Sequence, residues 1–418
     1  MAQLSNDCFA FGGELMRADE ALSILAARAV PVAGIERAAL RQAAGRILAA
    51  DIVAARSVPP HDNAAVDGYA VHFDDLVPDG ETRLPVRGRA AAGHPMEGVQ
   101  PRGTAVRVFT GALMPQGPDT VFMQEDVRLD GAFAILPPGQ KRGANRRKAG
   151  EDIVAGKTVL AAGQRLRAQD VGLIASLGIV EITLRAKLRV AVFSTGDELR
   201  EPGADAPPGS VYDANRFALM ALLEKSGCAV TDLGILADRR DVVSAALAAA
   251  AASHDAIVTS GGMSTGDEDH VRAAVEANGK IHFWRLAIRP GRPVAFGTIA
   301  GKAFVGLPGN PVAMVVTFLR FARPVLLRLA GAADVAPLSF RVRTGFDIRK
   351  KEGRREWLRA RLTLDTDGMQ LARRFPRDGA GILTSLVESD GLVELAENVT
   401  DLPAGAMVDF LPYSELAS

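Results

Sequence analysis

The stretch RVAVFSTGDEL, residues 189–199, decides the fold class. It begins with a mostly apolar run and ends in polar residues and a glycine, which is typical of a strand buried in a parallel sheet. Helices and strands are predicted to alternate after it, with helices at 215–225, 241–252, 269–277 and 311–330 and strands at 228–235, 256–260 and 303–307. Such alternation forms βαβ units, so residues 186–332 are predicted to be a doubly wound α/β domain with a mostly parallel sheet.

The segments on either side of this domain have a different pattern of apolar and polar residues. Residues 17–51 are predicted to be helical in two pieces separated by Pro31, and a further helix is predicted around AQDVGLIASLG, residues 168–178. Short alternating segments such as TAVRVFTG and WLRARLTL favour β-structure. We therefore expect a multidomain α/β protein with four parts: a mixed α+β domain I (14–56 and 145–185), a β-rich insertion domain II (57–144), domain III (186–332) and a small, barrel-like β domain IV (333–418).

The composition excludes several classes of protein. Among 418 residues, 48% are hydrophobic and 23% charged, which is ordinary for a globular chain. Lys+Arg and Asp+Glu both number 49, so a general nucleic-acid or anionic-membrane binder is disfavoured. The two cysteines, Cys8 and Cys228, form neither a disulfide framework nor a metal knuckle. With no signal-peptide pattern and no apolar run long enough to cross a bilayer, a cytoplasmic location is expected.

Three glycine-containing loops follow predicted strands of domain III: STGDEL (194–199), SGGMSTGDEDH (260–270) and GLPGNP (306–311). In open α/β sheets ligands bind beyond the carboxyl ends of the strands, so these loops should converge on one crevice. Glycines such as Gly261 and Gly262 let backbone N–H groups approach an anion closely. Ordinary strand-to-helix turns would explain any one of the loops, but the three together favour a ligand site.

Two of these loops carry carboxylates. Asp197, Glu198 and Asp269 next to an anion site would make sense around a hard divalent cation, most plausibly Mg²⁺. The alternative is that some of them are helix N-caps and first-turn acids, which suit the helix dipole. The sequence leaves both interpretations open.

Between the second and third loops lies the cationic stretch WRLAIRPGRPVAFG, residues 284–297. Arg285, Arg289 and Arg292 offer planar forks of donors that suit phosphate or another tetrahedral oxyanion. A solvated run of charge is the alternative. The Pro-Gly punctuation favours a shaped, functional loop.

Three further polar motifs lie in the N-terminal half: PPHDNAAVDGYAV (59–71), RVFTGALMPQGPDTVFMQED (107–126) and NRRKAGEDI (145–153). Each fits turn chemistry and function about equally well. Signatures of P-loop, dinucleotide-binding, zinc-protease and serine-hydrolase sites are absent from the sequence.

In this order, the motifs resemble those of the molybdopterin molybdenumtransferases, the family of bacterial MoeA and of the gephyrin E domain. The matching stretches are DNAAVDGYAV, TGALMPQGPDTVFMQED, RRKAGEDI, FSTGDEL, SGGMSTGDEDH, LAIRPGRP and GLPGNPVA. The resemblance runs from about residue 17 to residue 413. It implies a Mg²⁺-dependent transferase that inserts molybdate into adenylated molybdopterin and releases AMP, forming the molybdenum cofactor.

The resemblance also implies an architecture and partners. The family has elongated four-domain subunits that form homodimers whose clefts involve both protomers. Its α/β domain is similar to that of the adenylyltransferase, MogA, that acts one step earlier. That adenylyltransferase and the proteins that mature molybdoenzymes are candidate protein partners, whereas no nucleic-acid or membrane partner is implied.

The motifs carry over to individual residues of this chain. The expected catalytic residues are Asp67, Thr110, Arg147, Asp152, Glu198, Asp238 and Asp269, and the expected metal-binding acids are Asp197, Glu198 and Asp269. Residues expected to bind the pterin substrate or molybdate are Thr195, Gly196, Ser260, Gly261, Gly262, Arg285, Arg289, Arg292, Pro308, Gly309, Asn310, Pro311, Arg354 and Ser385.

This chain also departs from the family pattern. Arg289 and Arg292 stand where lysine is common, and Ala64 and Ala313 stand where serine is common. Two alternative functions remain at this stage. One is a molybdopterin adenylyltransferase that consumes ATP, and the other is a non-catalytic molybdopterin-binding or scaffold protein.

Overall fold

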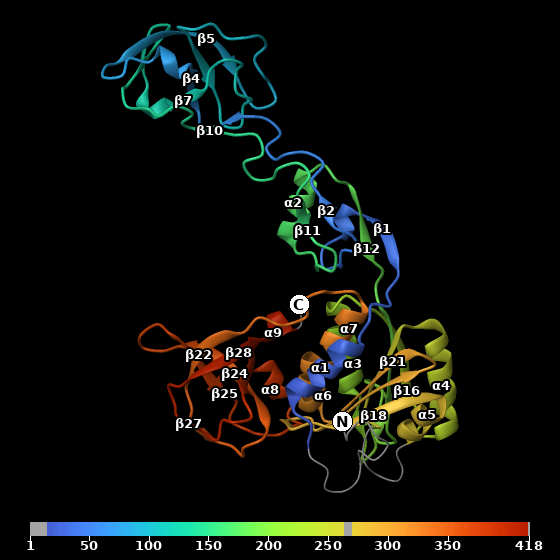
Figure 1. The fold of residues 1–418 in the computed structure, drawn as a ribbon. Helices are drawn as coiled ribbons and strands as arrows, with labels where there is room; N and C mark the ends of the chain where they lie inside the picture. Colours follow the sequence, from blue (N-terminus) through green and yellow to red (C-terminus); the bar gives the residue numbers. More distant parts are fainter. Residues whose placement is uncertain (1–14, 263–269, 417–418) are drawn as a thin grey trace.

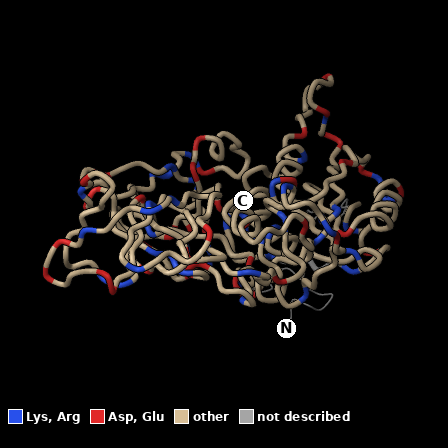
Figure 2. Tube along the Cα trace, turned by 90° about the horizontal axis from the view of Figure 1, so that it is seen from above, with Lys and Arg blue, Asp and Glu red and all other residues tan. Residues whose placement is uncertain are grey.

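The computed structural model describes residues 15–262 and 270–416. The chain is elongated (Figure 1): the α/β domain and a C-terminal barrel form one lobe, a mixed module follows, and a β-rich module lies at the far end. Lysines and arginines are interspersed with acids along the trace (Figure 2), as expected from the balanced composition. Among the described residues, no helix is both long and apolar enough to cross a membrane.

The α/β domain is built on a six-stranded sheet whose first four strands are parallel and whose last two are antiparallel to their neighbours. In spatial order they are β16 (Ala229–Leu236), β13 (Arg189–Thr195), β17 (Ala256–Ser260), β21 (Lys302–Leu307), β20 (Pro293–Ile299) and β18 (Gly279–Arg285). Alternate residues of β13 pack to opposite sides: Val190 and Val192 into one core, Ala191 and Phe193 into another. The strand is therefore buried on both faces, as its apolar run predicts.

Helices cover both faces of this sheet. On one face lie α3 (Ala214–Lys225), α6 (Pro311–Thr317), the π-helical segment η5 (Phe318–Ala322) and α7 (Arg323–Leu329); on the other lie α4 (Arg240–Ser253) and α5 (His270–Asn278). The predicted doubly wound α/β fold is confirmed. One local prediction was incomplete, because half of residues 284–297 belong to the antiparallel pair β18 and β20, and the connection between them, 286–292, itself contains the short strand β19 (Ile288–Arg289).

The C-terminal part forms a small closed barrel. Its strands, in order around the barrel, are β24 (Arg355–Leu364), β25 (Gln370–Arg374), β22 (Phe340–Thr344), β28 (Met407–Pro412) and β26 (Gly391–Leu395), and β26 pairs back with β24. The short elements β23 (Ile348–Arg349), β27 (Asp401–Leu402), α8 (Thr384–Val387) and α9 (Tyr413–Leu416) decorate it. Strand β19 (Ile288–Arg289) pairs with β24 and thereby joins the arginine loop of the α/β domain to the barrel.

The N-terminal segment corrects one prediction. Helix α1 (Ala18–Arg28) forms as expected and packs on α7, with Ala18, Ala21 and Leu25 in the core shared with the α/β domain. The predicted second helix over 35–51 is wrong: Ile35–Ala39 is strand β1, paired with β12 (Glu181–Arg185). Alanine-rich sequence has a high helix propensity, but pairing with a distant strand overrides that weak local preference here.

The mixed module and the β-rich module follow. The mixed module contains β1, β12, η2 (Leu40–Gln42), β2 (Ile52–Val53), β11 (Thr158–Leu160) and the predicted helix α2 (Ala168–Ser176).

The β-rich module is a six-stranded sheet in the order β7 (Thr120–Met123), β4 (Gly68–Val71), β6 (Ala105–Val108), β5 (Thr82–Ala90), β9 (Phe133–Leu136) and β8 (Arg128–Asp130), with the single turns η3 (Phe73–Asp75) and η4 (Gln124–Asp126). Strands β3 (Asn63–Ala64) and β10 (Arg146–Arg147) pair where the two modules join, and β14 (Leu199–Arg200) pairs with β15 (Val211–Tyr212) beside the α/β sheet. The four domain boundaries stay predictions.

Candidate functional site

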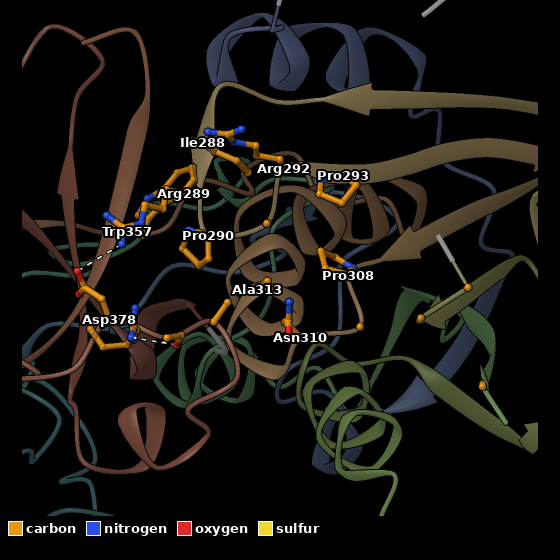
Figure 3. Close-up of a pocket in the computed structure, with 18 of the residues that line it drawn as sticks. Ile288, Arg289, Pro290, Arg292, Pro293, Pro308, Asn310, Ala313, Trp357 and Asp378 are labelled. Atoms are coloured by element: carbon orange, nitrogen blue, oxygen red, sulfur yellow. Dashed lines mark hydrogen bonds and ion pairs between the residues drawn. The ribbon is translucent and has the colours of Figure 1, made fainter. Parts of the chain in front are cut away.

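A cavity of about 710 Å³ lies between the strand-end loops of the α/β domain and the wall of the barrel (Figure 3). Its α/β side is lined by Thr195, Gly196, Glu198, Asp238, Gly261, Gly262, Pro308, Gly309, Asn310 and Ala313. The arginine loop contributes residues 288–293, and the barrel contributes Arg354, Trp357, Leu358, Arg359, Asp378, Gly379 and Ala380. The described residues of the three loops, which include Gly261 and Gly262 of the second loop, converge on this cavity as predicted.

Glycines allow the loops after β17 and β21 to touch. The Gly261 amide donates to the carbonyl of Leu307 (3.2 Å), and a Cβ on Gly309 would lie 3.7 Å from the Cα of Gly261. Asn215 at the start of α3 donates from Nδ2 to both the Ser260 hydroxyl (2.9 Å) and the Gly309 carbonyl (2.7 Å). These contacts fix the backbone that faces the cavity. Asn215 was missed by sequence reasoning, although its place at the start of a predicted helix was a signal.

Two polar groups in the α/β wall have no hydrogen-bond partner among the described residues. The hydroxyl of Thr195 and one carboxylate oxygen of Asp238, Oδ1, are buried without a hydrogen bond to any described residue. Buried polar atoms normally find partners, so each of these atoms is a candidate contact for a bound ligand. The Glu198 carboxylate folds over Gly196, where a Cβ would come within 2.6 Å of its Oε2 atom.

Other predicted residues support this wall rather than line it. Ser260 is buried and donates to the carbonyl of Pro308 (3.3 Å), and Pro311 is the first residue of α6. Asp197 is exposed, and its backbone carbonyl accepts from Arg200 (2.7 Å). Arg285 ends β18 and does not line the cavity.

The opposite wall is rich in arginines, and carboxylates beside the cavity hold two of them in place. The Glu356 carboxylate is fully buried and lies 3.2 Å from the Arg354 guanidinium and 3.4 Å from that of Arg289. Arg289 also contacts Asp378 at 3.3 Å, a pair drawn in Figure 3. Burial opposes ionisation of Asp378, but its hydrogen bond to Arg374 and the nearby charge of Arg289 outweigh that effect and lower its pKa.

Arg292 differs from Arg289 and Arg354 of this wall. Arg292 is exposed, and its side chain contacts no carboxylate in the described part of the chain. It is therefore available to an anionic ligand. Trp357 and Asp378 of the barrel lay outside the predicted site set, whereas Arg359, like Arg354 and Ser385, resembles a cleft position of the family. The only sequence feature that could have pointed to Asp378 as a site residue is the Gly-Ala-Gly turn that follows it, residues 379–381.

Behind this wall, Ser385 orients Arg359. The Nε atom of Arg359 donates to the buried Ser385 hydroxyl (3.0 Å), and Nη2 donates to the carbonyls of Arg377 (3.2 Å) and Gly379 (3.3 Å). Burial lowers the pKa of Arg359, with the charges of Tyr413 and Asp378 acting in the opposite direction. Ser385 thus acts through Arg359 and has no direct place in the cavity lining.

Four predicted residues lie far from the cavity within the chain. The Asp67 carboxylate accepts hydrogen bonds from the Thr110 amide and hydroxyl, both at 2.7 Å, and these bonds lower its pKa. Arg147 lies on β10, and the Asp152 amide donates to the Val58 carbonyl (3.0 Å). Figure 1 shows β4 and β10 at the end of the molecule remote from the α/β sheet. Asp269 lies outside the described residues.

The predicted magnesium site is only partly described. In residues 15–262 and 270–416, no group of three or more His, Cys, Asp or Glu side chains has the arrangement of a complete metal site. Glu198 and Asp238 nevertheless both line the cavity. Two carboxylates suit Mg²⁺ when a substrate phosphate supplies further oxygen ligands.

Comparisons with known families match nearly the whole chain. Residues 16–178 match the MoeA N-terminal region (domain I and II), 191–328 match a probable molybdopterin binding domain and 341–413 match the MoeA C-terminal region (domain IV). A protein named molybdopterin molybdenumtransferase from Haemophilus influenzae is 38% identical to this chain, and the match covers 90% of this chain and 93% of the relative. A protein of the same name from a Nostoc strain is 34% identical, and that match covers 86% of this chain and 85% of the relative.

Solved structures agree with these matches. A molybdopterin biosynthesis MoeA protein from Pyrococcus horikoshii has a TM-score of 0.83 at 29% identity, covering 96% of this chain and all of that one. The fold, the cavity and these matches thus define a multidomain protein whose α/β domain matches a probable molybdopterin binding domain. The chain belongs to the MoeA family, the molybdopterin molybdenumtransferases. The predicted family and its class, a transferase, are confirmed.

Proposed function

We propose that this chain inserts molybdenum from molybdate into adenylated molybdopterin and releases AMP. The observation that carries the proposal is the cavity itself, in which an arginine wall faces glycine loops and two buried polar atoms that have no hydrogen-bond partner among the described residues. Its volume of about 710 Å³ is within the usual range for small-molecule sites. Both substrates bear oxyanions, which arginine forks and backbone amides bind well.

Residues on the two walls take different roles. Arg289 and Arg292 bind an oxyanion from one side, while the Thr195 hydroxyl and the glycine loops contact the adenylate from the other. Arg354 and Arg359 hold the far end of the substrate. Catalysis then rests on positioning and charge stabilisation. Burial raises the pKa of Cys228 to about 12, so that thiol supplies no nucleophile.

A magnesium ion fits the acidic corner of the cavity. Glu198 and Asp238 would hold it, and the buried Oδ1 atom of Asp238, which has no hydrogen-bond partner in the part of the chain that the structure describes, is the observation that favours this assignment. Asp197 and Asp269 are the remaining candidate ligands. When bound, Mg²⁺ would neutralise phosphate charge.

We also propose that two copies of the chain form a homodimer with shared sites. Asp67, Thr110, Arg147 and Asp152 lie on modules that extend away from the cavity of their own chain. A partner subunit could bring its copies of these residues to the cavity. In the same proposal the protein works in the cytoplasm, between the molybdopterin adenylyltransferase and the proteins that mature molybdoenzymes.

The test is AMP release from adenylated molybdopterin with and without molybdate, with and without Mg²⁺. The native protein is expected to release AMP only with molybdate and faster with Mg²⁺. Asp238→Asn is expected to lower the rate, while the exposed loop variant Asp205→Asn serves as a matched control. Tight pterin binding without AMP release would favour the scaffold alternative, and ATP consumption with unmodified molybdopterin would favour the adenylyltransferase.

A further inference from the structure

Two arginines lie side by side on the β-rich module, on neighbouring parallel strands. Arg89 of β5 is directly opposite Arg107 of β6 in the strand register. Both guanidinium groups lie over the ring of Phe109, with their central carbons 4.6 and 4.8 Å from its centroid. Arg107 also lies 5.0 Å from the ring centroid of Tyr69. The aromatic rings hold the two cations in place through their negative faces.

In the described part of the chain no carboxylate forms an ion pair with this Arg89–Arg107 pair, and Asp67 acts on Arg107 only through its charge. Arg107 donates to the side-chain oxygen of Gln124 and to the Gly68 carbonyl (3.5 Å), both neutral groups. The two positive charges repel each other, and solvent weakens this repulsion because Arg89 is exposed. The fold thus keeps an unfavourable pair of cations that a bound anion would relieve.

Other arginines that lie over aromatic rings in the same module are neutralised. Arg83 lies over Phe133 and pairs with Asp130 at 3.1 Å. Arg142 lies over Phe73 and pairs with Asp119 at 2.9 Å. The aromatic contact alone therefore does not account for the absence of an ion pair at Arg89 and Arg107 among the described residues.

The pair is also close to a predicted part of the active site. Phe109 directly precedes Thr110, whose amide and hydroxyl bind Asp67. After these hydrogen bonds from Thr110, the charge of Arg107 contributes to the lowered pKa of Asp67. A ligand held by the two arginines would therefore lie beside the Asp67–Thr110 pair.

We propose that the Arg89–Arg107 pair is a second oxyanion subsite, which binds a tetrahedral dianion: molybdate or the phosphate of the adenylated substrate. Two planar guanidinium forks suit such a group. The inference rests on the proposed function for the identity of the anion. Its place on the β-rich module means that each subunit would offer the anion to the cavity of its partner.

Calorimetric titration of the full-length protein with sodium molybdate and, separately, with AMP tests this subsite. Every protein carries Arg292→Gln, so that binding in the main cavity is weakened equally. The double variant Arg89→Gln/Arg107→Gln is compared with Arg83→Gln, a control that removes an arginine lying over a ring of the same module. We expect the double variant to bind at least one of the two anions about tenfold more weakly, because charge-assisted hydrogen bonds are lost.

The outcomes separate the possible sources of the anion. Weaker binding of molybdate alone assigns the subsite to molybdate, and weaker binding of AMP alone assigns it to the adenylate phosphate. Unchanged affinity for both anions, equal to that of Arg83→Gln, overturns the proposal. If the double variant fails to fold, Arg89→Lys/Arg107→Lys replaces it, since lysine keeps the charge but loses the fork; unchanged affinities in that variant overturn the proposal as well.

The subsite and the proposed reaction can fail independently. Molybdate-dependent AMP release by the unsubstituted protein tests the reaction alone. If the unsubstituted protein releases AMP but the double variant binds both anions normally, only the subsite is rejected. If the unsubstituted protein releases no AMP but the double variant binds an anion more weakly, the reaction is rejected and the subsite is kept.

Discussion

Gly262 is the position where a single methyl group should disturb the cavity most directly. Its φ is +63°, and a Cβ there would lie 2.4 Å from Cγ2 of Val271 and 2.7 Å from Cγ2 of Thr195. Optimal carbon–carbon contacts are about 3.5–4.0 Å, so both overlaps are severe. Gly262→Ala must therefore displace Thr195, which lines the cavity, or the start of α5, which carries Val271.

The cost of this change can be divided into two parts. Alanine in a left-handed conformation costs roughly 1–2 kcal/mol, and overpacking adds about 1–3 kcal/mol. Gly131 provides a matched control: its φ is +60°, and nothing lies within 4 Å of a Cβ built there. Gly131→Ala should bear only the first cost, in a module remote from the cavity of its own chain.

Thermal unfolding measures the sum of the two costs, and steady-state AMP release measures the effect of displacing Thr195. For Gly262→Ala we expect kcat/KM to fall by about tenfold or more, since each 1.4 kcal/mol of lost transition-state stabilisation is a factor of about ten. Gly131→Ala should keep the native kcat/KM. Equal kcat/KM values for the two variants would refute the reasoning that Gly262 shapes the substrate-binding wall.

Four further outcomes are expected. Thr195→Val should leave thermal stability unchanged or slightly raised while weakening AMP binding about tenfold in calorimetry, because the lost hydroxyl has no described protein partner but is available to a ligand. Ser385→Ala should destabilise the barrel by about 1.5–3 kcal/mol in denaturant unfolding, because the buried Arg359 loses an acceptor; an unchanged midpoint would contradict this. The pKa of Asp67 is lowered in the folded protein, so folding favours its ionised form. The stabilisation is therefore complete above the unfolded-state pKa of about 3.9 and is lost as the pH falls through the lowered folded-state pKa. Thr110→Val should raise the pKa of Asp67 in an NMR titration. Cys228, whose pKa is raised to about 12 by burial, should resist alkylation at neutral pH in the folded protein and react after denaturation, as mass spectrometry of the Cys228 peptide would show.

Local patterns predicted the α/β domain well. The strand 256–260 coincides with β17, and the three glycine loops meet at one cavity as the topology of a parallel sheet requires. The failure at 35–51 has a different origin. The strand there forms because Ile35–Ala39 pairs with residues 181–185, and the local sequence does not predict that long-range pairing.

The barrel side of the cavity was equally hard to foresee. Trp357 and Asp378 reach the site because β19 pairs with β24, which brings the arginine loop against the barrel. Sequence motifs identified Arg289 and Arg292 but not the buried Glu356 that fixes the first of them. Such second-layer residues lack a motif of their own, because their role depends on burial and on the position of the arginine they contact.

The shared site between two subunits is tested most directly by complementation. Asp67→Asn lies on the β-rich module and Arg292→Gln lies on the cavity wall, and each variant alone should lose most of its molybdate-dependent AMP release. The two variants are co-expressed with different tags, and the mixed dimer is isolated by both tags. A shared site predicts one intact site in each mixed dimer, and therefore about half of the native activity. Activity no higher than that of the single variants would contradict the account.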